Sequence, residues 1–271
     1  MMHFRDFTHV LLCVVDDEVF GVTQLLDIVY IVCARLTAIM RFSTRTNQRL
    51  TDIRVKGLIQ PWDIAACEQT SVVYVADGDA ECVWRVSSDG KDVKCWLPKS
   101  PSDTFRSFTL SVTSSQLLVT SWGTNQLRQF DEVGDELRRV DLPDNMEPRH
   151  AVESGTGTFI LSHFNTQLKQ DQVSEVNTGG QVLRQFSGSR LLPLDYTPHI
   201  AVDSQGNIFV ADCGSRRILL LNSEIALRRV IIDEHQLKYK EPQSLCCNEQ
   251  SGQLLVGFYY GGVAVFGVLR R

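Results

Sequence analysis

One strand pattern recurs along the chain at a nearly constant interval. Each copy is a short run of β-branched, aromatic and leucine residues that ends in a small or turn residue, as in VVYVADG and NIFVADCG. The second core residue of each copy lies 42 to 49 residues after the preceding one. These marker residues are Tyr30, Tyr74, Leu118, Ile160, Phe209 and Leu255. A strand repeat of about 40–50 residues is typical of propeller blades, so we predict an all-β fold of six blades.

Each repeat contains the material for four short strands. A strand that is often opened by proline precedes the marker strand, and two more strands follow it across Asp-Gly, Val-Gly or Gly-Gly turns. Four strands joined in this way form one twisted antiparallel sheet. Such a sheet buries its two faces only against neighbouring sheets around an axis. A β-sandwich with coincidental spacing is the alternative, while helical folds are disfavoured because no long stretch keeps a 3.6-residue period.

The two ends of the sequence suggest how the ring closes. The last repeat supplies three strands and stops at Arg271, whereas residues 9–15 near the N-terminus form a strand that belongs to no repeat. We predict that 9–15 completes the last blade by pairing with the strand around Val263 to Leu269. Without this pairing, the first and last blades would expose edges prone to aggregation. The whole chain, 1–271, is therefore predicted to be one domain.

The composition excludes several classes of protein. Hydrophobic residues make up 43% and charged residues 22%, which is typical of soluble globular proteins and not of disordered chains. Apolar stretches such as 28–34 fall far short of the roughly 18 residues that span a bilayer, and Asp16, Asp17 and Glu18 stand where a signal peptide would be cleaved. The net charge of −5 disfavours a domain built to grip DNA.

Eight cysteines are scattered through the apolar strands, and none forms a C-x-x-C pair. This distribution is typical of small buried side chains with free thiols, and not of a disulfide framework or a zinc site. No Asn-x-Ser/Thr sequon occurs. The sequence therefore predicts a reducing, cytoplasmic environment.

The fifth repeat, PHIAVDSQGNIFVADCGSRRILLLNS, resembles an NHL repeat. The matching residues are Pro198, Ala201, Val202, Asp203, Gly206, Ala211, Asp212, Arg217 and Ile218. The second repeat matches more loosely at Pro61, Tyr74, Val75, Ala76, Asp77 and Val83, and the fourth at Pro148, Ala151, Val152 and Glu153. The third and fourth repeats depart from the pattern, with Arg106 near the proline position and ILSHF in place of an Ala-Asp ending. The absence of Trp-Asp and Tyr-Trp-Thr-Asp argues against WD repeats and receptor propellers.

The resemblance implies a binding function. NHL propellers are often the C-terminal modules of tripartite-motif ubiquitin ligases, in which they bind protein or RNA. This sequence contains no RING domain, B-box or coiled coil, so a role in ubiquitin ligation would require a fused or separate partner. We therefore expect a monomeric, non-catalytic scaffold propeller that recognises a protein.

One face of such a propeller carries both the loops that enter each blade and the loops between its second and third strands. Aromatic and arginine side chains are the usual anchors of interfaces. The predicted partner-binding residues on this face are Trp62, Trp122, Arg149, His150, His199, Arg216, Arg217, Tyr259 and Tyr260.

Single-stranded RNA is an alternative partner, because bases stack on aromatic rings and cations meet phosphates. Acidic residues are expected near the same rim, however, and this mixed charge suits a protein better than a polyanion. They are Asp77, Asp79, Glu81, Asp144, Glu147 and Asp212.

A further alternative is a lactonase-like hydrolase, since some six-bladed propellers resemble lactonases that hold calcium in the central channel. The positions after the entry prolines hold Trp62 and Asp63, Arg149 and His150, His199 and Ile200, and Gln243 and Ser244. Calcium takes six to eight oxygen ligands, and Asp63 is the only acid among these residues. His150 and His199 with Asp63 form another potential metal set, from loops at unknown separation. No nucleophile or phosphate-loop motif occurs, so we expect no catalysis, no metal and no cofactor.

Overall fold

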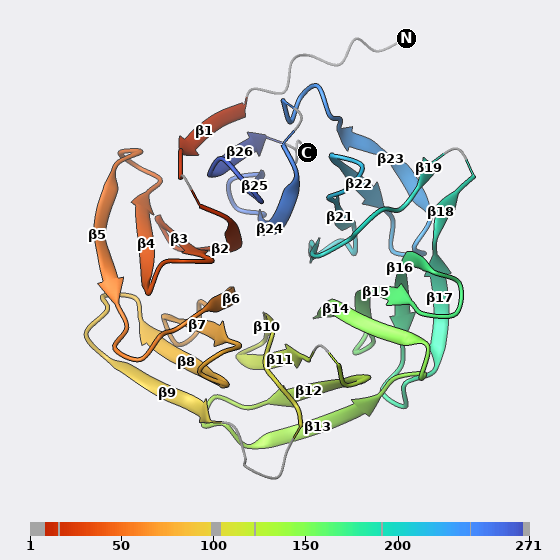
Figure 1. Ribbon diagram of the computed structural model, residues 1–271, viewed down its shortest axis with the longest axis horizontal. Coiled ribbons are helices and arrows are strands. Elements are labelled where there is room, and N and C mark those ends of the chain that lie inside the picture. The colour runs from red at the N-terminus through yellow and green to blue at the C-terminus, as the bar shows by residue number, and fades with distance from the viewer. Residues whose placement is uncertain are drawn as a thin grey trace.

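The computed structural model describes residues 9–15, 17–98, 104–121, 123–190, 192–238 and 240–267. Six four-stranded antiparallel sheets surround a central axis (Figure 1), which confirms the predicted six-bladed β-propeller. The first strand of each sheet lies toward the axis and the fourth lies at the rim. Nothing in the described part of the chain forms a helix that could reach across a bilayer.

The strands follow one another blade by blade. The first three blades are β2 (Val19–Leu25), β3 (Ile28–Cys33), β4 (Ala38–Ser43) and β5 (Arg49–Arg54); β6 (Pro61–Cys67), β7 (Val72–Asp77), β8 (Cys82–Ser87) and β9 (Val93–Pro98); and β10 (Thr109–Thr113), β11 (Gln116–Thr120), β12 (Gln126–Phe130) and β13 (Glu136–Asp141). The other three are β14 (Met146–Glu153), β15 (Phe159–Asn165), β16 (Gln170–Val176) and β17 (Val182–Phe186); β20 (Ile200–Val202), β21 (Ile208–Asp212), β22 (Arg217–Leu221) and β23 (Leu227–Ile232); and β24 (Pro242–Asn248), β25 (Gln253–Phe258), β26 (Val263–Gly267) and β1 (His9–Cys13).

The marker residues all lie on the second strand of their blades, and each is at most 4% exposed. The longest interval between markers, from Ile160 to Phe209, contains an added hairpin of β18 (Gly188–Ser189) and β19 (Leu192–Pro193). Each repeat therefore corresponds to one blade, and the hairpin of β18 and β19 accounts for the longest interval.

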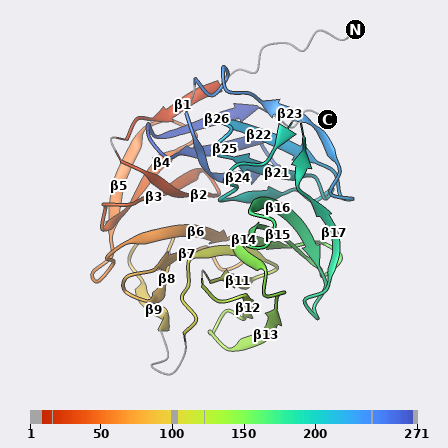
Figure 2. The same cartoon turned by 45° about the vertical axis from the view of Figure 1, so that its right-hand side comes forward.

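The N-terminal strand closes the ring. β1 pairs antiparallel with β26, with His9 opposite Phe266 and Cys13 opposite Val263. The two strands lie side by side in both views, although they come from opposite ends of the chain (Figures 1 and 2). The predicted closure is confirmed, and the pairing covers residues 9–13 of the predicted 9–15.

Apolar side chains are buried between neighbouring blades. Six clusters of buried residues occur among the described residues, and each combines side chains from two adjacent sheets. One of them joins Val19 and Ile31 of the first blade to Leu255 and Val263 of the last. Each sheet therefore depends on its neighbours for burial, as expected for stacked repeats.

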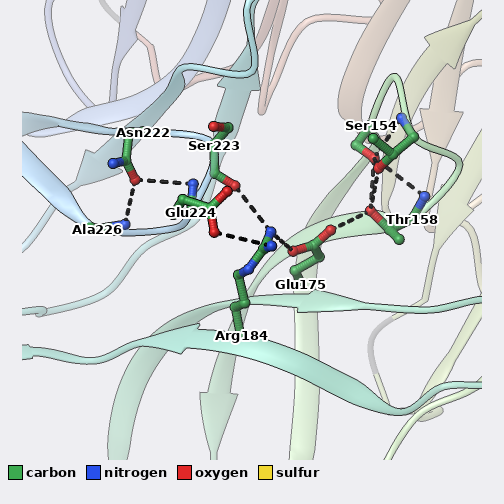
Figure 3. A network of polar contacts seen from close by, with 9 residues as sticks. Ser154, Thr158, Glu175, Arg184, Asn222, Ser223, Glu224 and Ala226 are labelled. Atoms are coloured by element: carbon green, nitrogen blue, oxygen red, sulfur yellow. Dashed lines mark hydrogen bonds and ion pairs between the residues drawn. The ribbon is translucent and has the colours of Figure 1, made fainter.

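Polar contacts also bridge blades toward the rim. The guanidinium of Arg184 on β17 pairs with Glu175 at 2.8 Å and with Glu224 of the next blade at 3.0 Å (Figure 3). Thr158 donates a hydrogen bond of 2.6 Å to the other oxygen of Glu175. This network ties the fourth and fifth blades in sequence order together outside the apolar clusters.

The Ala-Asp endings of the second and fifth repeats have a structural role. The fully buried Asp77 carboxylate accepts hydrogen bonds from the backbone N–H groups of Ile59 and Gln60, in the loop that enters the same blade. Asp212 accepts one from Asp195 N–H in the same way and also pairs with Arg217 at 2.6 Å. These carboxylates fix the entry loops, and the loops in turn position the innermost strands.

The eight cysteines are free thiols, as predicted. Burial raises the pKa of the Cys33 and Cys213 thiols to about 12. Thiols of this kind stay protonated at neutral pH and are poor nucleophiles.

Candidate functional site

The innermost strands pair irregularly where they begin, and the residues at these irregular positions lie at one end of the central channel. Among the described strands, β2, β6, β14 and β24 each carry a β-bulge where one extra residue interrupts pairing with the second strand. The extra residues are Phe20, Trp62, Arg149 and Gln243. A bulge re-aims the side chain of the unpaired residue. All four side chains line the same cavity, which we call the mouth.

The mouth has a volume of about 70 Å³ and an aromatic wall. The Trp62 ring stacks on Phe20, with centroids 4.9 Å apart, and meets the edge of Phe108 at 5.3 Å. The remaining lining residues are Thr109, Pro148, Arg149, Tyr196, Pro198, His199 and Gln243. This wall offers a flat apolar surface to a ring-shaped or planar ligand.

Arg149 is held at the side of the mouth. Its guanidinium pairs with Asp171 at 2.8 Å and lies 4.4 Å from the centre of the Tyr196 ring. Asp171 also accepts a hydrogen bond from Tyr196 N–H. Because both neighbours are themselves fixed, Arg149 presents a positioned positive charge to the mouth.

Three ionisable side chains gather below the mouth, and we call them the floor. Asp63 and His150 directly follow the bulged residues of β6 and β14, and His199 immediately precedes β20. Their exposed fractions are 0%, 2% and 8%. Oδ2 of Asp63 lies 3.9 Å from His150 Nε2, and Oδ1 of Asp63 lies 3.7 Å from His199 Nε2. The two imidazole rings stack with centroids 3.6 Å apart.

Backbone contacts hold the floor in place. Asp63 accepts hydrogen bonds from Ile64 N–H and Leu110 N–H, both at 2.8 Å. The carbonyl oxygen of Leu110 lies 3.2 Å from His150 Nε2. Gly21 leaves room for this arrangement, since a Cβ there would lie 2.7 Å from Ile64 N. These contacts hold the innermost strands β2, β6, β10 and β14 against one another at the axis.

The charge balance of the floor is unusual. Within the described ranges, Asp63 forms no ion pair with lysine or arginine, so the titratable side chains beside this fully buried carboxylate are the two imidazoles. Burial, aided by the neighbouring His199, lowers the pKa of His150 well below its usual value, and that ring is neutral. A neutral imidazole beside a carboxylate can accept a proton or bind a cation.

The floor separates two cavities. His199 lines the mouth, and both histidines also line a second cavity of about 340 Å³ at the opposite end of the channel. His199 is therefore the floor residue that a ligand in the mouth meets first.

A third buried histidine lies outside the channel. His163 on β15 contacts Ser174 Oγ through Nε2 at 2.9 Å, and burial lowers its pKa to about 4. Its role is structural.

This pKa predicts an acid-sensitive fold. An unfolded histidine takes up a proton below about pH 6.5, whereas folded His163 resists protonation down to about pH 4, so stability is complete above pH 6.5 and falls between these values. The shift corresponds to up to about 3 kcal/mol at pH 4. Thermal melts at pH 7 and pH 4 should show a smaller loss for His163→Gln than for the wild type. An equal loss in both proteins would assign the acid sensitivity to other groups.

The structure brings together four of the nine predicted binding residues. Trp62, Arg149 and His199 line the mouth, and His150 lies on the floor. Four others do not line the mouth. Arg216 forms an ion pair with Glu241 at 3.3 Å, and Arg217 forms one with Asp212. Tyr260 donates a hydrogen bond to Glu18, and its ring contacts the ring of Tyr259. Trp122 lies outside the described residues.

Sequence reasoning missed three of the lining residues, Phe20, Phe108 and Thr109. The positions after the entry prolines gave the right register for four blades. The first and third blades lack an entry proline, which hid Phe20 and Phe108.

Comparisons with known proteins show the fold. No protein-family profile and no curated protein matches the chain. A gluconolactonase from Xanthomonas campestris has a TM-score of 0.74 at 10% identity, over 96% of this chain and 89% of that one. Virginiamycin B lyase from Staphylococcus aureus has 0.69 at 11%, over 97% and 99%. A chain of the nidogen/laminin complex has 0.66 at 13%, over 94% and 87%. Similarity at these identities establishes a six-bladed propeller and no narrower family.

The prediction of a non-catalytic scaffold, without enzyme activity, is wrong. Gluconolactonase and virginiamycin B lyase are enzymes that match the chain over nearly its full length. A propeller in the nidogen/laminin complex shows that the fold occurs in other settings, so the site must carry the argument. The buried floor of Asp63, His150 and His199 lies where the lactonase alternative places its chemistry.

Proposed function

We propose that this chain is a ring-opening enzyme of the hydrolase or lyase class, which acts on a lactone or related cyclic ester at the mouth. The observation that carries the proposal is the position of His199, at the base of an aromatic cavity and next to a buried carboxylate. The similarity to gluconolactonase and virginiamycin B lyase supports this choice of reaction.

The mouth supplies the means to hold a cyclic ester. The stacked rings of Phe20 and Trp62 bind an apolar or planar ring face. Arg149 directs N–H donors toward a carbonyl oxygen, and its ion pair with Asp171 keeps it in position. These contacts place the reacting bond over His199.

The chemistry at His199 is a proton transfer. In hydrolysis, Nε2 accepts a proton from water as the water oxygen bonds to the carbonyl carbon; the ring C–O bond then breaks and the proton passes to the leaving oxygen. In elimination, Nε2 takes the proton from carbon, a C=C bond forms and the ring C–O bond breaks. The Asp63 carboxylate, 3.7 Å away, stabilises the imidazolium in either case.

Calcium, which the lactonase alternative implies, does not fit this floor. Calcium takes six to eight oxygen ligands. The floor offers the carboxylate of Asp63, the carbonyl of Leu110 and two imidazoles. The proposed proton transfer therefore involves no calcium.

Other features remain proposals of narrower scope. The buried carboxylates of Asp77 and Asp212 support an NHL-type relationship of their repeats. Eight free thiols support a cytoplasmic location. A protein or RNA partner at the rim stays a prediction.

A panel of γ- and δ-lactones and one cyclic depsipeptide tests the proposed function. Acid release reports hydrolysis, and absorbance of a new double bond reports elimination. We expect turnover of at least one member, and we expect Trp62→Ala to raise its KM by about tenfold because the stacking surface is lost. Tyr260→Ala, at an exposed ring outside the mouth, is the matched control and should leave KM unchanged. An unchanged KM in Trp62→Ala would remove the mouth as the binding site.

A further inference from the structure

Four potential ligand atoms converge below the mouth. One ligand atom each from Asp63, His150 and His199 lie within 4.8 Å of one another, and Leu110 O lies 3.2 Å from His150 Nε2. We propose that these atoms form a binding site for a divalent transition-metal ion of the zinc class. This inference goes beyond the proposed function, because it concerns the metal-bound chain, whereas the proposed proton transfer requires the metal-free chain, in which His199 Nε2 keeps its lone pair.

The spacing suits a tetrahedral ion. Zinc binds imidazole nitrogen and carboxylate oxygen at about 2.0–2.2 Å, which places neighbouring ligand atoms about 3.3–3.6 Å apart. His150 Nε2 lies 3.2 Å from Leu110 O and 3.9 Å from Asp63 Oδ2, and His199 Nε2 lies 3.7 Å from Asp63 Oδ1. The ligand atoms of the three side chains lie within 4.8 Å of one another, so binding a tetrahedral ion requires them to draw closer together.

Burial and charge favour a cation at this point. The fully buried Asp63 carboxylate has no lysine or arginine partner among the described residues, and a buried charge is costly without compensation. A divalent ion supplies the missing positive charge where the carboxylate and both imidazoles converge.

The second nitrogen of each imidazole can carry the ring proton. His150 Nδ1 and His199 Nδ1 are buried and have no hydrogen-bond partner in the part of the chain described, so no neighbouring donor keeps the proton off either atom. With a metal bound at Nε2, the proton of each neutral ring resides on Nδ1, and the contact between His150 Nε2 and Leu110 O becomes a pair of adjacent ligands.

The donor set selects the class of metal. Imidazole suits zinc, copper, iron and nickel, whereas calcium and magnesium prefer oxygen alone. The floor contributes two nitrogens and two oxygens. The mouth and the second cavity leave His199 accessible from two sides, so an ion can enter the assembled channel.

Metal titration of the full chain tests the site. After dialysis against chelator, isothermal titration with Zn²⁺ should give one site per chain, and Ca²⁺ should give none. Co²⁺ should give the visible absorption of a tetrahedral nitrogen and oxygen site, without thiolate charge transfer. His199→Gln and His150→Gln should each weaken Zn²⁺ binding by about 100-fold or more.

A control variant distinguishes Zn²⁺ binding at the floor from Zn²⁺ binding at the protein surface. His235→Gln changes an exposed histidine on a turn and should leave the affinity unchanged. Circular dichroism of each variant without metal establishes that the fold is intact. Weak, multi-site or absent Zn²⁺ binding by the wild type would overturn the proposal. Undiminished affinity in His199→Gln would also overturn it. If a single variant unfolds, the double variant with His150→Gln and His199→Gln serves instead, and Zn²⁺ binding by that folded chain would overturn the proposal.

Discussion

The His199→Ala variant should open lactone rings about 10²–10⁴ times more slowly than the wild type, measured as kcat/KM on the first substrate found in the panel. The expected loss is large because His199 is the one floor residue that also lines the mouth, next to the Asp63 carboxylate. Among the described residues that line the mouth, His199 is the only one with an imidazole or carboxylate group.

The stability of this variant should stay close to that of the wild type. The imidazole of His199 stacks on His150 and is spaced beyond hydrogen-bond distance from Asp63, so its removal breaks no hydrogen bond that holds the blades. Melting curves should therefore overlap within a few degrees. His235→Ala is the control for a histidine outside the channel. A kcat/KM equal to the wild type in His199→Ala would place the chemistry elsewhere.

Deletion of residues 1–16 should abolish the monomeric fold. The deletion removes β1, exposes the backbone edge of β26, and takes Leu12, Cys13 and Val15 out of the cluster between the first and last blades. An unpaired apolar edge is a template for association between chains. We expect aggregation or large oligomers by size-exclusion chromatography with light scattering, and loss of the cooperative thermal transition.

A shorter deletion separates the strand from the residues before it. Removal of residues 1–8 leaves β1 intact and should give a monomer with the wild-type melting temperature. A stable monomer after deletion of 1–16 would show that β1 is dispensable, and that the ring closes through its apolar clusters alone.

The fold was predictable because its signal is repeated. Each marker, such as Tyr30 or Phe209, occupies the same buried position in its blade, and six copies at similar spacing leave few alternative folds. The closure was predictable for a related reason: one strand, 9–15, was left over where one blade lacked a strand. Neither inference required the position of any single side chain.

The site was harder to predict because it depends on side-chain direction. The β-bulges at Trp62 and Arg149 turn these residues into the mouth and bring Asp63 and His150 to the axis, and no local sequence pattern specifies a bulge. The three floor residues are also far apart in sequence, so contiguous catalytic motifs give no signal. The expectation of no catalysis rested on the absence of such motifs and was wrong.

The two rim arginines have structural partners that the sequence did not indicate. Arg216 and Arg217 follow an Ala-Asp ending and were predicted to bind a partner. Asp212 instead holds the guanidinium of Arg217, which leaves 14% of that side chain exposed. A buried carboxylate near a predicted anchor is therefore a reason to expect a structural ion pair.

The central claim is tested most directly by a variant that lacks both Trp62, from the aromatic wall of the mouth, and His199, the proposed proton acceptor. Its rate of ring opening is the quantity measured. The measurement compares the wild type with a folded Trp62→Ala and His199→Gln double variant across the whole panel of cyclic esters. The account predicts that the wild type opens at least one ester well above the rate of the double variant, which should match the uncatalysed rate. Equal rates for every ester would contradict the assignment of a catalytic centre to this channel.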